Sequence, residues 1–151
     1  MNVAEIMKKS VVTVNSSATI EQAVAISSIA DVSGLPVVDD AGILVGVITE
    51  HDIIRAMLPT YKDLLASDEA MLSGTLLQDR ALEIRNMPVE SIMTRNVITA
   101  TEDEKVLKVA STMILKSIKR LPVVRAGSPV GIVSRVDIVH ALMCGPSGCR
   151  I

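Results

Sequence analysis

The stretch Gly46-Val47-Ile48-Thr49-Glu50-His51-Asp52-Ile53 is present twice in this chain, because residues 131–138 read Gly-Ile-Val-Ser-Arg-Val-Asp-Ile. Both copies keep a glycine, two β-branched apolar residues, a hydroxyl residue and an aspartate three positions after that hydroxyl. Three further matches precede each copy in the same order: Ile6-Met7 and Ile92-Met93, Val11-Val12-Thr13 and Val97-Ile98-Thr99, Leu35-Pro36-Val37-Val38 and Leu121-Pro122-Val123-Val124. Matched positions lie about 86 residues apart up to the Leu-Pro pair and one fewer after it. An internal repeat of this kind decides the architecture before any single residue does.

The composition limits both the core and the classes of partner. The 151 residues are enough for one hydrophobic core, and because the chain lacks Phe and Trp, that core must consist of Val, Ile, Leu, Met and Ala. The absence of aromatic stacking platforms and the net charge of −2 argue against a nucleic-acid surface. No apolar run approaches the ~20 residues of a bilayer span, and residues 1–10 do not form a signal peptide. We therefore expect a cytoplasmic protein that binds neither nucleic acid nor a membrane.

The first repeat, residues 3–58, predicts the element order β-α-β-β-α. Strands are expected at 11–14, 35–38 and 44–48, with a helix beginning near Thr49. The helix between the first two strands begins at Thr19, which has capping-box spacing to Gln22, and Gly34 is expected to end it. Its expected inner face consists of Ile20, Ala23, Val24, Ser27 and Ala30.

The second repeat, residues 89–143, predicts the same order. Strands are expected at 97–99, 121–124 and 130–133, and the last helix runs from Ser134 to Met143. The other helix begins near Asp103 and has the inner residues Val106, Val109, Ala110 and Met113. Since one repeat buries only a small face, we expect both to form one mixed α/β module of the α+β type over residues 1–151, with pseudo-two-fold symmetry and a cleft between the repeats.

The residues outside the repeats carry weaker signals. Residues 59–88 predict a helical spacer that Gly74 breaks, with Leu64, Met71 and Leu72 on one helix and Leu77, Ala81 and Ile84 on the other. The spacer either covers an edge of the fold or contacts a partner. Residues 144–151 predict a flexible tail with two ordinary thiols, Cys144 and Cys149, whose alternatives are a tail disulfide or a metal shared between subunits. Two thiols do not complete a zinc site, and the spacing of the histidines adds no ligand, so we expect no metal.

The doubled patterns Thr49-x-x-Asp52 and Ser134-x-x-Asp137 have two interpretations. A hydroxyl followed by an acid three residues later is typical of a helix N-terminus, where both side chains cap free N–H groups. A binding site is the other interpretation, because the preceding glycine allows a ligand or another backbone to approach and the junction lies at the carboxyl ends of strands. A carboxylate accepts hydrogen bonds from vicinal ribose hydroxyls, and Ser or Thr donates to phosphate.

This ordered set of four motifs, present twice, resembles the cystathionine-β-synthase (CBS) domain, which is found as tandem pairs called Bateman modules. The resemblance covers residues 3–58 and 89–143. It implies a regulatory module that binds AMP, ADP, ATP or S-adenosylmethionine between the repeats, with or without magnesium and with no required cofactor, and that regulates an enzyme or transporter. It places Asp52 and Asp137 at ribose and Thr49 and Ser134 near ribose or phosphate. Residues flanking the base would be Val12, Thr13, Leu35, Ile98, Thr99 and Leu121, and further candidate ligand contacts are His51, Arg120 and Arg135.

Other functions remain open at this point. An enzyme is disfavoured because neither His51 nor His140 is spaced from a Ser or Cys as in a nucleophile–base pair. A protein-interaction scaffold with a vestigial cleft is the main alternative to ligand binding. The apolar helices after both motifs favour a homodimer. Four matched positions are basic only in the second repeat, so phosphate-bearing ligands are expected to prefer it: Ser33, Gly34, Asp39 and Glu50 correspond to Lys119, Arg120, Arg125 and Arg135.

Overall fold

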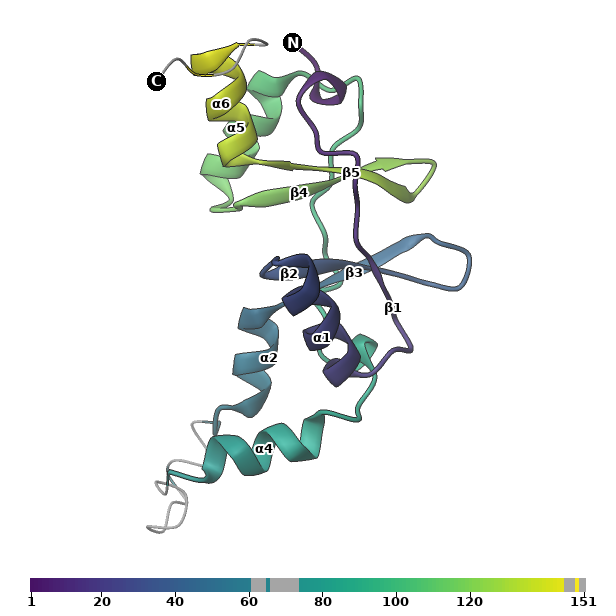
Figure 1. Ribbon diagram of the computed structural model, residues 1–151, viewed down its shortest axis with the longest axis vertical. Helices are drawn as coiled ribbons and strands as arrows, with labels where there is room; N and C mark the ends of the chain where they lie inside the picture. Colours follow the sequence, from purple (N-terminus) through teal and green to yellow (C-terminus); the bar gives the residue numbers. More distant parts are fainter. Residues whose placement is uncertain (61–64, 66–73, 146–148, 150–151) are drawn as a thin grey trace. The chain divides into compact units, whose positions relative to one another are not determined.

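The computed structural model describes residues 1–60, 65, 74–145 and 149 (Figure 1). It has a mixed α/β fold, as predicted, with two small sheets in the described residues. The chain forms two compact units: unit 1 contains Met1–Val12, Asp40–Leu44 and Val97–Ile151, and unit 2 contains Thr13–Asp39 and Val45–Asn96. The units therefore interleave the two sequence repeats, because the first segment of each repeat belongs to the unit built on the other.

Unit 2 is built on the first repeat. Strands β1 (Val14–Asn15), β2 (Gly34–Val38) and β3 (Leu44–Thr49) form a sheet in the order β1-β2-β3, and β1 is parallel to β2. Helices α1 (Ile20–Ala30) and α2 (Glu50–Met57) lie on one face of this sheet (Figure 1). The 3₁₀ turn η3 (Val89–Ser91) adds Val89 and Met93 to a core that contains Val14, Ala23, Leu35, Val37 and Ile48.

Unit 1 is built on the second repeat. Strands β4 (Arg120–Arg125) and β5 (Ser128–Ser134) form an antiparallel hairpin with an irregularity between Val123 and Val124. Helices α5 (Val106–Leu115) and α6 (Arg135–Cys144) pack on one face of the hairpin (Figure 1). The 3₁₀ turn η1 (Val3–Glu5) adds Val3 to the core of Ala100, Val106, Val109, Met113, Leu121, Val123, Val133 and Ile138.

The two Ile-Met segments pack on the doubled motif of the other repeat. Lys8, directly after Met7, exchanges backbone hydrogen bonds with Ile132 at 2.8 and 2.9 Å. Thr94, directly after Met93, does the same with Val47, at 2.9 Å in both directions. Each motif strand thereby gains a short backbone partner from a segment more than 40 residues away in sequence. We call residues 6–8 and 92–94 the lead-in segments.

Several predicted boundaries are wrong for identifiable reasons. The β-branched run 11–14 contributes only Val14 to a strand, and 97–99 forms none, because the parallel partner strand is met only at Val14 and at Ala100. Helix α1 ends at Asp31, which itself takes the left-handed conformation (φ 54°), so Gly34 is not the helix terminator. Val24 is 45% exposed and does not belong to the inner face of α1.

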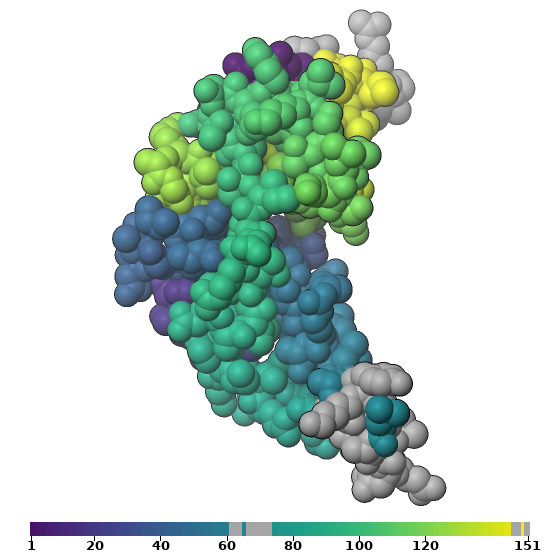
Figure 2. All heavy atoms as spheres, turned by 180° about the vertical axis from the view of Figure 1, so that it is seen from behind, coloured from purple at the N-terminus to yellow at the C-terminus, as the bar shows by residue number. Residues whose placement is uncertain are grey.

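The spacer is described only in part. Helix α4 (Leu76–Ile84) is present as expected and buries Ile84, while Leu64, Met71 and Leu72 lie outside the described residues. In unit 2, α4 contacts α2, and both are visible in teal and blue in Figure 2. Within the described part of the chain, no helix combines the length and apolar character needed to cross a bilayer.

Candidate functional site

The two doubled motifs form the same helix cap, one in each unit. Thr49 is the N-cap of α2: its backbone N–H and its hydroxyl both donate to Asp52 Oδ2, at 2.9 and 3.0 Å, and its hydroxyl accepts from the Asp52 N–H at 3.3 Å. Ser134 caps α6 in the same way, donating to Asp137 Oδ2 from its N–H at 2.8 Å and its hydroxyl at 2.6 Å. The capping interpretation of the motif is therefore confirmed in both copies.

The second carboxylate oxygen of each aspartate faces a lead-in segment. Asp52 Oδ1 accepts a hydrogen bond from the Thr94 hydroxyl at 2.9 Å. Asp137 Oδ1 lies 3.5 Å from the Lys8 ammonium, whose side chain is 73% exposed. Lys8 and Thr94 occupy matched positions of the two repeats, directly after the Ile-Met pair. One motif aspartate therefore meets a neutral hydroxyl and the other an exposed cation.

The motif glycines are explained by the lead-in backbones. A Cβ added to Gly46 would lie 2.6 Å from Met93 Sδ and 2.9 Å from the Thr94 carbonyl oxygen. A Cβ on Gly131 would lie 2.6 Å from Met7 Sδ and 3.1 Å from the Lys8 carbonyl oxygen. The sequence predicted that either a ligand or another backbone approaches these glycines. In the structure a lead-in backbone lies against both of them.

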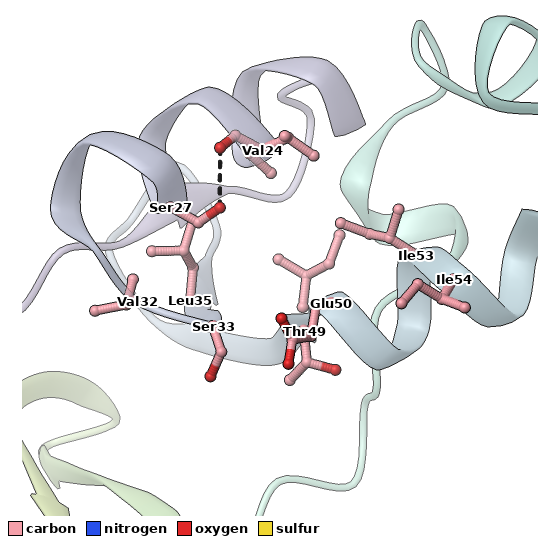
Figure 3. Close-up of a pocket in the computed structure, with 12 residues that line it drawn as sticks. Val24, Ser27, Val32, Ser33, Leu35, Thr49, Glu50, Ile53 and Ile54 are labelled. Carbon is pink, nitrogen blue, oxygen red and sulfur yellow. Dashed lines mark hydrogen bonds between the residues drawn. The ribbon is translucent and has the colours of Figure 1, made fainter. Parts of the chain in front are cut away.

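A pocket of about 190 Å³ lies in unit 2 beside the first motif (Figure 3). Its walls are mostly aliphatic side chains of α1, β2, β3 and α2, and polar groups come from Ser27, Ser33, Thr49 and Glu50. The Ser27 hydroxyl is turned back to the Val24 carbonyl, to which it donates at 2.9 Å. Of the candidate contacts, the pocket brings Leu35 and Thr49 together, whereas Asp52 is not among its lining residues.

The remaining candidate residues divide between the units. Unit 2 holds Thr13 and the exposed His51, while unit 1 holds Val12, Ile98, Thr99, Arg120 and Leu121. Leu35 and Leu121 are core residues, 1% and 2% exposed. Val12 and Ile98 are exposed and retain aliphatic surface for contact with a base.

Two of the arginines that distinguish the second repeat have structural partners. Arg135 donates from Nε to the Ile118 carbonyl at 2.8 Å and from Nη2 to the Met113 carbonyl at 3.3 Å, which holds the end of α5. Arg125 forms a bidentate pair with Glu102, at 2.8 and 2.7 Å. This hydrogen-bonded guanidinium lowers the pKa of Glu102, and the carboxylate raises the pKa of Arg125. Two of the basic side chains of the second repeat thus form hydrogen bonds within the fold.

Sequence reasoning missed Lys8 and Thr94 as neighbours of the two aspartates. The signal was the repeat alignment itself, which shows that the residue after Ile-Met differs in charge between the repeats. Using it required knowing that each lead-in packs on the other motif. The tail prediction is also corrected, since the structure joins Cys144 and Cys149 in a disulfide and both are described without a free thiol.

Comparison with known proteins agrees with the doubled architecture. Protein MJ1225 of Methanocaldococcus jannaschii is 33% identical over 140 residues, which is 93% of this chain and 42% of that relative, so the chain spans less than half of its length. The structure of the CBS domain pair of protein MJ0100, in complex with 5'-methylthioadenosine and S-adenosyl-L-methionine, is 34% identical with a TM-score of 0.69, covering 94% of this chain and 95% of that one.

A second similar structure is CBSX2 of Arabidopsis thaliana, solved in complex with AMP. It is 27% identical with a TM-score of 0.69 and covers 94% of this chain and 96% of that one. The family model described as the CBS domain matches residues 3–59 and 89–144, one segment for each sequence repeat. The chain belongs to the CBS domain family and carries a tandem pair of these domains.

Proposed function

We propose that this protein is a non-catalytic regulatory module that binds an adenosine-containing ligand: AMP, ADP, ATP or S-adenosylmethionine. The observation that supports it best is the pair of capped aspartates, each held in a fixed orientation at a helix start. Similar CBS pairs have been solved with AMP and with S-adenosyl-L-methionine and 5'-methylthioadenosine. Binding of such a ligand would report nucleotide or methyl-donor level to a partner enzyme or transporter.

The caps leave each carboxylate with a free acceptor position. Oδ2 of Asp52 and of Asp137 accepts two hydrogen bonds from its cap residue, which fills its two lone-pair positions. Among the described residues, Oδ1 of Asp52 accepts one hydrogen bond, from Thr94, and retains a second position, and Oδ1 of Asp137 has only the 3.5 Å ion pair with Lys8. A ribose hydroxyl can donate to Oδ1 without opening the cap. Since the cap fixes the carboxylate rotamer beforehand, little ordering entropy is lost on binding.

The unit 2 pocket can take only part of such a ligand. Its volume of about 190 Å³ is below the ~300 Å³ at which pockets for complete drug-sized ligands begin. Aliphatic walls suit the flat face of a base, and the Thr49 hydroxyl, which already donates to Asp52, can still accept one hydrogen bond from the polar edge of the base. The ribose and any phosphate would then extend beyond this pocket.

We propose further that phosphate-bearing ligands prefer the site that contains Asp137. The Lys8 ammonium lies beside this aspartate, whereas the matched position beside Asp52 is a threonine. A charge-assisted hydrogen bond is worth roughly 1.5–3 kcal/mol, equal to about tenfold or more in affinity. In this proposal Lys8 has the role that the sequence comparison gave to Lys119, Arg120, Arg125 and Arg135.

Calorimetric titration with AMP and adenosine tests both parts of the proposal. Asp137→Ala should remove the tighter AMP event, and Asp52→Ala should leave it largely intact. Lys8→Thr should weaken AMP about tenfold while leaving adenosine unchanged, because only AMP carries the phosphate. Gln22→Ala is the matched control, since it opens a third capping box at Thr19, outside the proposed contacts.

Two outcomes would contradict the proposal. If Gln22→Ala weakens AMP as much as Asp137→Ala does, the aspartate acts only through helix stability. If Lys8→Thr weakens the binding of AMP and of adenosine equally, the lysine does not contact phosphate.

A thermal-shift series with AMP, ATP and S-adenosylmethionine precedes the titration, because any ligand that binds the folded state raises the melting temperature. No shift with any of them would favour the scaffold function.

The non-catalytic part of the proposal has its own test. Pure protein incubated with ATP and magnesium should form no ADP above background, because Thr49 and Ser134, whose hydroxyls donate to Asp52 and Asp137, are held in helix caps. Steady hydrolysis that Asp137→Ala abolishes would overturn this part alone and leave ligand binding intact.

A further inference from the structure

The end of helix α6 gathers three side chains that the proposed function does not use. His140 and Cys144 are four residues apart on α6 and so lie on the same helical face. Gly145 follows with a φ of 64°, and the Cα of Cys149 lies only 4.3 Å from that of Cys144. The two sulfur atoms and a ring nitrogen of His140 all lie within 4.8 Å of one another.

We propose that His140, Cys144 and Cys149 form a binding site for a thiophilic divalent cation, of which Zn²⁺ is the best match, when the disulfide is reduced. Two thiolates and one imidazole are preferred zinc ligands, and a three-residue set leaves the fourth tetrahedral position for water or for a side chain of another molecule. Sequence spacing did not identify His140 as a ligand. His140 lies four residues before Cys144, and the two side chains reach the same ion only if the chain between them is helical.

The three ligand atoms already lie near one another. With Zn–S near 2.3 Å and Zn–N near 2.0–2.1 Å, two ligands of one ion are at most about 4.6 Å apart. The observed limit of 4.8 Å is slightly larger and belongs to the disulfide-bonded state, so after reduction the two cysteine side chains must rotate apart around the ion while His140 approaches it. The site also lies at the C-terminus of α6, where the partial negative charge of the helix favours a cation. His140 and Cys149 are exposed and Cys144 is half-buried, so an ion can reach all three.

The disulfide and the metal exclude each other, which makes the site sensitive to redox conditions. Reduction by a dithiol transfers two electrons and two protons to the S–S bond, giving two thiols here and one disulfide in the reductant. Zn²⁺ then displaces both thiol protons and binds two thiolates, with no change in its own oxidation state. Reoxidation by a small-molecule disulfide returns two electrons to that oxidant, re-forms the S–S bond and releases the ion.

The test uses the full chain, reduced and freed of reductant without oxygen, and titrated with Co²⁺ and then Zn²⁺. Co²⁺ bound to thiolates gives a sulfur-to-metal absorption band, which Zn²⁺ should remove by displacement. We expect one ion per chain, loss of the band in Cys144→Ser and in Cys149→Ser, and binding weakened more than about tenfold in His140→Gln. The oxidised protein should bind no ion.

His51→Gln is the matched control, because His51 is the other histidine of the chain and lies at the start of α2. It should leave the affinity unchanged. Circular dichroism of each variant checks that α6 is intact. Equal affinity in wild type and His140→Gln would overturn the three-residue site, and so would a reduced wild type that binds no better than the variant lacking both cysteines. Neither result bears on adenosine binding.

Discussion

The packing of each lead-in segment on the opposite motif can be tested at the two motif glycines. A methyl group at Gly131 would meet Met7 Sδ at 2.6 Å and the Lys8 carbonyl oxygen at 3.1 Å. At Gly46 the same distances are 2.6 Å to Met93 Sδ and 2.9 Å to the Thr94 carbonyl oxygen. Ordinary contacts of a Cβ begin near 3.4 Å, so alanine at either position must displace a lead-in.

The loss of stability expected for each alanine variant depends on which neighbouring atoms can move away from the added methyl group. The Met thioether is flexible and can shift at small cost. The carbonyl oxygens belong to backbone bridges with Ile132 and Val47, and displacing one weakens two hydrogen bonds, each worth about 0.5–1.5 kcal/mol. Together with overpacking of 1–3 kcal/mol, this predicts a loss of about 2 kcal/mol for Gly131→Ala and nearer 3 kcal/mol for Gly46→Ala, where the carbonyl is closer. Gly74→Ala is the control, because nothing lies within 4 Å of its added Cβ.

Double-mutant cycles in urea unfolding decide which lead-in packs on which motif. Gly131→Ala combined with Met7→Ala should lose less stability than the sum of the two single changes, since removing the thioether relieves part of the clash. Gly46→Ala should couple to Met93→Ala in the same way. The crossed pairs, Gly131 with Met93 and Gly46 with Met7, should be additive within about 0.5 kcal/mol. Coupling in the crossed pairs, together with additivity in the pairs Gly131–Met7 and Gly46–Met93, would refute the packing of each lead-in segment on the motif of the other repeat.

Three other outcomes are expected. Light scattering should show a homodimer at micromolar concentration, because α5 and α6 expose apolar side chains. Leu142→Arg should weaken this dimer, since Leu142 is 63% exposed. Arg135→Ala should lower the free energy of unfolding by roughly 1.5–3 kcal/mol, since two carbonyls at the end of α5 lose a charged donor, whereas Arg125→Ala should cost little because its pair is exposed. Arg125 lowers the pKa of Glu102, so the stabilisation by this ion pair is fully present above the ordinary value of 4.5 and is lost as pH falls through the lowered pKa. The stability difference between wild type and Glu102→Gln, followed by urea unfolding, should therefore shrink below pH 4.5 and vanish below the lowered pKa.

Local signals made most of the fold predictable from the sequence. Thr19, Thr49 and Ser134 were identified as helix starts because the acceptor or acid three residues later closes a capping box, and all three boxes are present. The inner face of α5 was read from its spacing, and Val106, Val109 and Met113 are buried there. Such features depend on residues three or four positions apart, which a single sequence displays directly.

Features that depend on distant contacts could not be predicted. The lead-ins Ile6-Met7 and Ile92-Met93 are identical, and both motif strands offer a glycine, so no local preference decides which lead-in meets which strand. The β-branched runs 11–14 and 97–99 failed as strands for a related reason. β-propensity mainly measures packing against a partner, and each run meets its partner strand only at its end.

The exchange of lead-ins also changes how the two repeats must be compared. Matching positions between the two repeats assigned the phosphate preference to Lys119, Arg120, Arg125 and Arg135. Of these, Arg125 is paired with Glu102, and Arg135 donates to two carbonyls at the end of α5. The informative comparison is crossed: Lys8 of the first repeat stands beside Asp137 of the second, and Thr94 of the second beside Asp52 of the first. Exchanging the two side chains, Lys8→Thr with Thr94→Lys, should therefore move the preference for AMP over adenosine from the Asp137 site to the Asp52 site. A preference that stays with Asp137 in this double variant would mean that the remaining cations of the second repeat, not the lead-in residue, select the phosphate.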